Sequence, residues 1–157
     1  TVFEFPRDAR RIAPPFSPYP LITVVFQQLF LWPNLTVREN TALVLSGDKG
    51  AGLSEDAVEI FEKLLITEIL DLLPHQCSLG QRQRAVFARA HLSQARYLLL
   101  DEPTSALDRA NRQVLIEIVG AAREKGRGFM VISHDEADFE PVVTRRLELE
   151  NGQLFER

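Results

Sequence analysis

Cysteine is nearly absent from this 157-residue sequence, since Cys77 is the only one. A lone cysteine excludes a framework of internal disulfides and favours a reducing compartment. Long apolar runs are also missing, because none approaches the ~20 residues that a membrane-spanning helix needs. The N-terminal segment carries charged residues where a signal peptide would be apolar. These absences predict a soluble cytoplasmic domain.

An excess of positive charge is lacking too. The sequence has 18 Lys and Arg against 22 Asp and Glu, which gives a net charge of -4. Proteins that bind nucleic acids usually carry a basic surface, so we expect no nucleic-acid partner. The hydrophobic fraction of 45% is ordinary for a globular domain, and the length allows a substantial core.

Three short apolar runs have the length of strands. They are Leu21–Phe26, Tyr97–Leu100 and Phe129–Ser133, and each is continuous rather than alternating. Continuous apolar runs are typical of strands that are buried on both faces of a parallel sheet. The dipeptide Asn151–Gly152 lies between two further apolar segments and predicts a hairpin.

Helical patterns lie between these runs. Apolar residues recur at three- and four-residue spacing through Ala57–Leu73, which predicts a helix that Pro74 ends. Capping residues predict helix starts at Asn34 or Thr36, Ser54, Ser78 and Asp108. Strands that alternate with helices predict an α/β core with a mainly parallel sheet, and residues 34–92 have the pattern of an inserted helical subdomain.

Two carboxylates follow the second apolar run. Asp101 and Glu102 come at the end of a buried strand, which is where ligands bind in open α/β sheets. Neighbouring side chains on a strand point to opposite faces, but Pro103 favours a break that turns Glu102 back. We expect Asp101 to hold Mg²⁺, usually through water, and Glu102 to orient and deprotonate an attacking water. Taken alone, the pattern also fits an ordinary acidic loop.

The segment Ser78–Gln81 has the S-x-x-Q pattern of a capping box. Free backbone N–H groups and the helix dipole make such a helix start a site for anions. The alternative is an ordinary cap, since this pattern is common. Its position favours the anion site, because the helix leads directly into the strand that carries the two carboxylates.

Single polar residues follow the other two apolar runs. His134 comes after Phe129–Ser133, where its imidazole would bond a γ-phosphate and steer the water. Gln27 comes after the first run and offers a neutral amide to Mg²⁺ or water. The three strand ends would converge on one edge of the sheet. His75 and His91 are interpreted as structural.

Four segments together resemble the nucleotide-binding domain of ABC-type ATPases, in particular the importer form. The segment Phe26–Asn40 is similar to the Q-loop, and His75–His91 is similar to the signature motif and its helix. The segment Tyr97–Asp108 is similar to the Walker B motif and D-loop, and Ile132–Asp135 is similar to the motif of the switch histidine. The order and spacing match across about Ile22–Gly152. The resemblance implies a RecA-like P-loop NTPase core (residues 1–33 and 93–157) and a helical signature subdomain (residues 34–92).

The resemblance also implies an ATP sandwich, in which two such domains bind two nucleotides, each with Mg²⁺, between them. Catalysis and Mg²⁺ binding would fall to residues of the same subunit, namely Gln27, Asp101, Glu102 and His134. Contact with the partner's ATP would fall to Ser78, Gly80 and Gln81. The D-loop, Ser105–Asp108, would cross the interface, with Asp108 as its last residue. Membrane permease subunits would be the other partners. The chain would then lie in the cytoplasm, at the inner face of the cell membrane.

Two features depart from the family pattern. Leu79 stands where the usual signature, LSGGQ, has a glycine, which predicts weaker or altered contact with the partner's ATP. The P-loop pattern G-x-x-x-x-G-K-[ST] is missing, because the sequence contains no Gly-Lys dipeptide. The glycine-rich Gly47–Gly50 has the wrong order, and only the proline-rich Thr1–Pro20 precedes the Q-loop. We therefore expect an N-terminally incomplete cassette that binds ATP weakly and hydrolyses little by itself.

Two other functions fit the same motifs. One is a non-catalytic subunit that donates Ser78–Gln81 to an intact partner while its own site stays empty. The other is a soluble ABC ATPase of DNA repair or translation. Those proteins commonly carry long insertions and basic surfaces, whereas the helical insert here is short and the net charge is -4.

Overall fold

The computed structural model describes residues 21–45 and 54–156. The expectations for Thr1–Pro20 and Gly47–Gly50 lie outside these residues. The elements in chain order are β1 (Ile22–Val25), α1 (Val37–Ala42), α2 (Glu55–Lys63), η2 (Thr67–Ile69), η3 (Pro74–Gln76), α3 (Leu79–Leu92), β2 (Tyr97–Asp101), α4 (Arg109–Glu124), β3 (Gly128–Ile132), α5 (Glu136–Phe139), β4 (Leu147–Glu150) and β5 (Gln153–Glu156).

The main sheet is parallel and three-stranded, in the order β1-β2-β3. Its register aligns Val25 with Leu100 and Asp101 with Ile132, so the three strands end close together. The strands β4 and β5 form a separate antiparallel hairpin. Asn151 and Gly152 at its turn have positive φ values of 49° and 80°, as the sequence pattern predicts. The α/β class and the parallel sheet are thereby confirmed.

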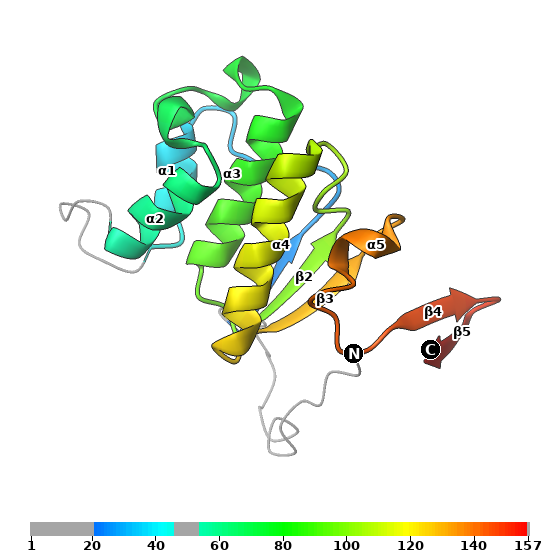
Figure 1. Cartoon of the computed structure of the whole chain (residues 1–157). Coiled ribbons are helices and arrows are strands. Elements are labelled where there is room, and N and C mark those ends of the chain that lie inside the picture. The colour runs from blue at the N-terminus through cyan, green and yellow to red at the C-terminus, as the bar shows by residue number, and fades with distance from the viewer. Residues whose placement is uncertain (1–20, 46–53, 157) are drawn as a thin grey trace, which may run out of the picture.

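The helices α3 and α4 lie over one face of this sheet (Figure 1). On that face Val25, Leu98 and Leu100 are at most 2% exposed. On the other face Leu99 is half-buried and Val24 is 39% exposed. The prediction that these strands are buried on both faces is therefore wrong for the described residues. The physical reason is that a single helical layer covers the sheet in this part of the chain.

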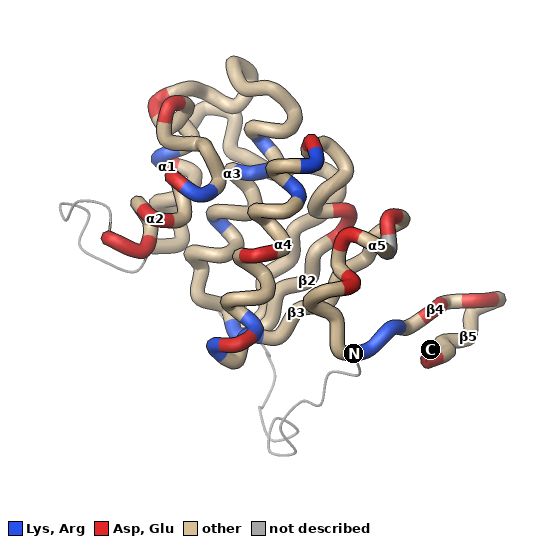
Figure 2. Tube along the Cα trace, in the orientation of Figure 1, with Lys and Arg blue, Asp and Glu red and all other residues tan. Residues whose placement is uncertain are grey.

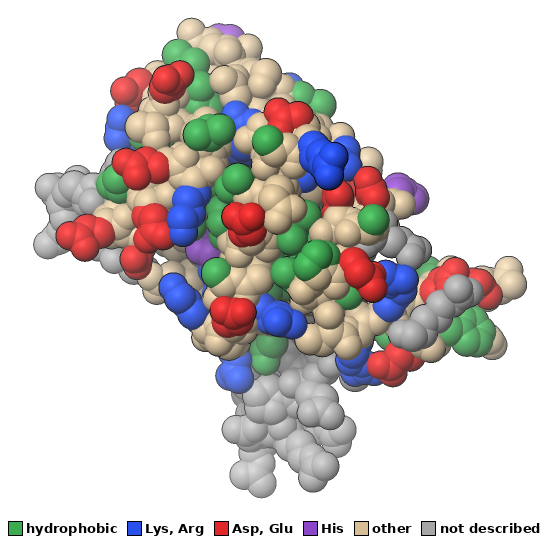
Figure 3. Space-filling model, viewed as in Figure 1, with side chains coloured by type: hydrophobic (Ala, Val, Ile, Leu, Met, Phe, Trp, Pro, Cys, Tyr) green, Lys and Arg blue, Asp and Glu red, His purple; other side chains and the backbone are tan. Residues whose placement is uncertain are grey.

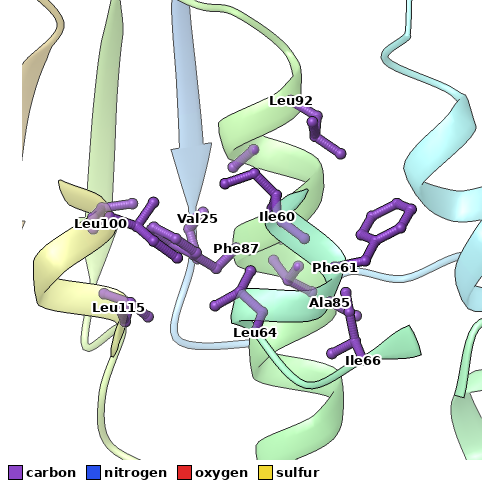
Figure 4. Packing of buried hydrophobic residues seen from close by; sticks show 14 of the residues in the cluster. Val25, Ile60, Phe61, Leu64, Ile66, Ala85, Phe87, Leu92, Leu100 and Leu115 are labelled. Atoms are coloured by element: carbon purple, nitrogen blue, oxygen red, sulfur yellow. The ribbon is translucent and has the colours of Figure 1, made fainter. Parts of the chain in front are cut away.

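The core lies between α3 and its neighbours (Figure 4). Phe87 of α3 is fully buried and points toward Val25 and Leu100 of the sheet. Leu64, at the end of α2, lies beside Phe87, and Phe61 of α2 is buried as well. The first helices of the chain thus pack onto the sheet through α3, so this helix determines where they lie relative to the strand ends.

The predicted helix caps are present. The hydroxyls of Thr36, Ser54 and Ser78 each accept a hydrogen bond from the backbone N–H three residues later. One helix boundary differs from the expectation. The pattern through Leu73 predicts one helix, but α2 ends at Lys63 and Leu65 has a positive φ of 51°. The left-handed backbone at Leu65 interrupts the helical hydrogen bonds. The apolar spacing then continues through the short 3₁₀ helix η2.

His91, near the end of α3, is held in its neutral form. Burial first, and then the charges of Arg127, Lys125 and Lys63, lower its pKa from 6.5 to about 4, against a weaker opposing effect of Asp56. The unfolded chain therefore binds the proton more readily between these two pH values. We expect the free energy of unfolding to fall by about 3 kcal/mol as the pH drops from about 6.5 to about 4.

Denaturant unfolding at several pH values checks this expectation. The variant His91→Gln removes the titration, so its free energy of unfolding should change less across this pH range than that of the wild type. His75→Gln, at an exposed histidine of η3, is the matched control and should keep the wild-type slope. Equal slopes for all three proteins would show that His91 does not cause the loss.

Candidate functional site

The carboxyl ends of β1, β2 and β3 carry the polar residues that the sequence predicts there. Gln27 lies two residues beyond β1 and is exposed, Asp101 is the last residue of β2, and His134 lies two residues beyond β3. Among the described contacts, Glu102 and His134 touch each other, whereas none joins Gln27 to either of them. Figure 2 shows further Asp and Glu residues around α5, close to this edge.

Glu102 occupies a turn immediately after β2. Its backbone has a φ of 50°, in the left-handed region, and its N–H donates to the carbonyl of Ile132 at 2.9 Å. The ladder between β2 and β3 is thus continued by one residue while the chain turns sharply. The predicted break after the strand is present, and it directs the Glu102 side chain toward the end of β3.

The carboxylate of Glu102 is held by the chain that follows β3. Its Oε1 accepts a hydrogen bond from the backbone N–H of His134 at 2.9 Å. The His134 Nε2 lies 3.7 Å from the same oxygen, and its side chain is 99% exposed, whereas that of Glu102 is 12% exposed. In such a pair the fixed carboxylate can accept a proton from water, while the exposed imidazole beside it can contact a phosphate.

The signature segment forms the capping box that the sequence predicts. Ser78 Oγ accepts from the Gln81 N–H at 3.2 Å, and the Ser78 N–H donates to Gln81 Oε1 at 2.8 Å. The box opens α3, a helix of 14 residues, whose dipole favours an anion at this end. Leu79 is 55% exposed, so its side chain points away from the core.

Asp108 caps the start of α4. It accepts from the backbone N–H of Asn111 at 2.9 Å and from the Asn111 side-chain amide at 2.8 Å. These bonds, with the backbone bond first, lower the pKa of the Asp108 carboxyl. The residue is exposed, as an interface position requires, but its described bonds are those of a helix cap.

Gln83 belongs to the same region and was missed by the sequence prediction. This α3 residue is only 3% exposed, and its amide bonds the turn that follows Glu102. The sequence signal that could have indicated Gln83 is its position two residues before the apolar run Ala85–Ala88, all of which is buried. A buried amide on the core side of a helix needs partners, and here the partners are backbone groups.

Asn40 and Arg89 are further residues that the sequence prediction missed. Asn40 is fully buried; its Oδ1 accepts from the Trp32 N–H at 2.8 Å, and its amide nitrogen lies within 3.1 Å of three backbone carbonyls. Arg89 of α3 donates to the carbonyl of Phe30. These bonds fix the segment after Gln27 against α1 and α3.

The strand ends carry carboxylate and amide oxygens, which are the kind of ligand that Mg²⁺ takes. The described residues include no cluster of three His, Cys, Asp or Glu side chains that could hold a metal ion. Mg²⁺ is usually bound by one or two carboxylates together with phosphate oxygens and water. Asp101 ends β2 and Gln27 follows β1, so both offer an oxygen at the carboxyl edge of the sheet.

Comparison with known proteins identifies the class to which this fold and site belong. The family model for ABC transporters matches residues 17–105, more than half of the chain. The chain belongs to the ABC transporter family. In the part of the chain that the structure describes, no helix is long and apolar enough to cross a membrane.

Among the relatives are three ATP-binding proteins. The chain is 35% identical to the spermidine/putrescine import protein PotA of Chromobacterium violaceum over 94% of its own length and 41% of the relative's. It is 35% identical to the arginine transport protein ArtP of Haemophilus influenzae, over 86% of its length and 57% of the relative's. It is 36% identical to the thiamine import protein ThiQ of Histophilus somni, over 87% of its own length and 65% of the relative's. The chain thus spans about half the length of these relatives.

Solved structures agree with the assignment. The dimeric bacterial ABC transporter cassette MJ0796 is 29% identical, with a TM-score of 0.71 over 85% of this chain and 61% of that one. A second structure of MJ0796, in a post-hydrolysis state bound to ADP and Pi, gives a TM-score of 0.72 over 86% and 62%. The fold is therefore that of an ABC cassette.

Proposed function

We propose that the chain acts in the ATP-binding subunit of an ABC importer, where it supplies the water-activating part of the site. The main support is the position of Glu102, whose buried carboxylate is fixed by the His134 N–H at 2.9 Å. The import and transport proteins among its relatives support the importer class. Residues 1–33 and 93–157 would form the core and residues 34–92 the helical signature subdomain.

In this proposal Glu102 accepts the proton of the attacking water, since its carboxylate is fixed near the strand end. His134 contacts the γ-phosphate, for which its ring is accessible because its side chain is 99% exposed. Asp101 and Gln27 hold Mg²⁺, which would neutralise charge on the phosphates when it is bound with ATP. The 157-residue sequence contains no Gly-Lys dipeptide, so no residue assigned here replaces the lysine of a P-loop.

The partner in this proposal is a second ABC domain. Ser78, Gly80 and Gln81 would meet its nucleotide, because the capping box presents the open start of α3. Asp108 would lie at the interface between the two domains. Membrane permease subunits would be the other partners, which would place the chain at the cytoplasmic face of the membrane. The face drawn in Figure 3 mixes Lys and Arg with Asp and Glu.

ATP binding by the 157-residue chain alone tests the first part of this proposal. We expect a dissociation constant in the millimolar range and negligible turnover, because the backbone cradle and lysine of the P-loop supply much of the phosphate affinity. Titration with a fluorescent ATP analogue measures the affinity, and an intact ABC ATPase serves as the positive control. Micromolar binding by the chain alone would overturn the expectation.

A non-catalytic role is the second candidate, and the well-formed capping box at Ser78 favours it. In that role the chain donates Ser78–Gln81 to the nucleotide of an intact partner. Adding the chain to the Haemophilus influenzae arginine transport protein should then raise ATP turnover, and Ser78→Ala should weaken the effect. Stimulation without turnover in the chain's own site would favour this candidate over the first.

A further inference from the structure

We propose that Gln83 is a positioning residue that locks the start of the signature helix to the turn between Glu102 and Leu107. This inference rests on the proposed function, in which the start of α3 meets the partner's nucleotide and this turn leads to the interface at Asp108. The lock would keep Ser78–Gln81 and the D-loop at a fixed separation. It would also fix the backbone of Glu102, the proposed base of the chain's own site.

Both ends of the Gln83 amide are used. Its Nε2 donates to the carbonyl of Glu102 at 2.8 Å, and its Oε1 accepts from the N–H of Ala106 at 2.9 Å. Nε2 also lies 3.4 Å from Ser105 Oγ. One end of this side chain must donate and the other must accept, so among residues of this length only glutamine satisfies the turn.

The carbonyl of Glu102 is the centre of this turn. Besides Gln83, the Ser105 hydroxyl donates to it at 3.1 Å and the Ser105 N–H at 3.3 Å. The residue that carries this carbonyl also has the left-handed φ of 50°. Several bonds thus converge on a backbone conformation that is costly by itself.

A second, independent contact joins the same two segments. Gly80, in the first turn of α3, lies so close to the turn that a Cβ added there would be 2.9 Å from the carbonyl oxygen of Ala106. The start of α3 and the backbone at Ala106 are therefore packed against each other directly. Since Gln83 is only 3% exposed, water cannot readily replace its bonds.

In the proposed sandwich, α3 would take part in both sites. Its capping box would face the partner's nucleotide, while its Gln83, five residues after Ser78, bonds the backbone of Glu102 in the chain's own site. A shift of the helix start would move the D-loop and the Glu102 carbonyl together. Gln83 would then act through other residues, without touching a nucleotide itself.

The test uses the whole 157-residue chain with two variants of Gln83. Gln83→Met keeps the length and removes both hydrogen bonds. Gln83→Glu keeps an acceptor for the Ala106 N–H and places a second acceptor against the Glu102 carbonyl. Gln153→Glu, the same chemical change at an exposed residue of β5, is the control. Thermal unfolding confirms that each variant is folded.

Two measurements are made on each protein. The first is hydrogen exchange at the Ala106 amide in the chain alone, where Gln83→Met should accelerate exchange about tenfold or more relative to wild type. The second is stimulation of the Haemophilus influenzae arginine transport protein at saturating ATP. Both Gln83 variants should lower the maximal stimulated rate about tenfold, with little change in the ATP concentration for half-saturation.

Each outcome decides one proposal. If Gln83→Met leaves the Ala106 amide protected, or both variants stimulate like wild type, the lock is rejected. If the wild-type chain gives no stimulation, the proposed donation of Ser78–Gln81 fails, and hydrogen exchange at Ala106 alone decides whether Gln83 holds the turn. Loss of stimulation with unchanged exchange in Gln83→Met would also reject the lock, because the helix start would then act by another route.

Discussion

Replacing Glu102 by glutamine is expected to lower the rate of ATP hydrolysis by about 10²–10⁴-fold, the range that general base catalysis contributes. The measurement requires an ATP-competent protein, for which a P-loop unit from an ABC ATPase is joined in front of Leu21. Glutamine retains the oxygen that accepts the His134 N–H, so the turn should keep its shape. Glutamine cannot accept the proton of the attacking water, so the hydrolysis step should slow. Because the turn keeps its shape, nucleotide binding should stay close to that of the parent.

The matched control is Glu117→Gln, the same change at an exposed residue of α4. A second variant, His134→Ala, separates the two roles in this pair. The His134 backbone N–H lies 2.9 Å from the Glu102 carboxylate, closer than the ring Nε2 at 3.7 Å, so alanine should preserve the carboxylate's position while reducing turnover. Turnover of Glu102→Gln within about threefold of the parent would exclude Glu102 as the base, since less than 1 kcal/mol of barrier would then depend on it.

Replacing Asn40 by alanine is expected to lower the free energy of unfolding by about 2–4 kcal/mol. The side chain is fully buried, and its removal leaves the Trp32 N–H and the carbonyls of Leu35 and Thr36 without this partner. Unsatisfied buried groups of this kind cost about 1–3 kcal/mol each when the site cannot admit water. Denaturant unfolding followed by circular dichroism measures the change.

Asn34→Ala is the control for this experiment, because Asn34 is exposed and surface substitutions usually change stability by less than about 0.5 kcal/mol. If Asn40→Ala lowers the free energy of unfolding no more than Asn34→Ala does, water replaces the lost bonds. We also expect the Asn40 variant to loosen the segment after Gln27, since Arg89 bonds both Asn40 and the carbonyl of Phe30.

The sequence predicts the features of this site that depend on local pattern. The apolar run before Asp101 indicates the strand, Pro103 indicates the break, and parallel strand ends place Glu102 near His134. The capping box at Ser78 is equally local, since its partner is three residues away. Such signals need only the spacing of neighbours along the chain.

Contacts between distant segments could not be predicted in the same way. Gln83 lies 19 residues before Glu102, and Arg89 lies 59 residues after Phe30, so neither pairing has a periodic signal. The break of α2 before Leu65 has no signal in the sequence either, because its apolar spacing fits a continuous helix. The partial exposure of Val24 depends on which layers cover the sheet, which a strand's own residues do not determine.

The left-handed backbone of Glu102 has a consequence for how this protein would respond to selection. A residue with a side chain gives up about 1 kcal/mol to adopt this conformation, whereas glycine adopts it freely. Glycine at position 102 would relieve this strain but would also remove the carboxylate that accepts the His134 N–H, so the two effects on stability oppose each other. A screen for heat resistance alone should therefore tolerate glycine there, whereas a screen for turnover should reject it. At this turn, activity restricts the choice of residue more strictly than thermal stability does.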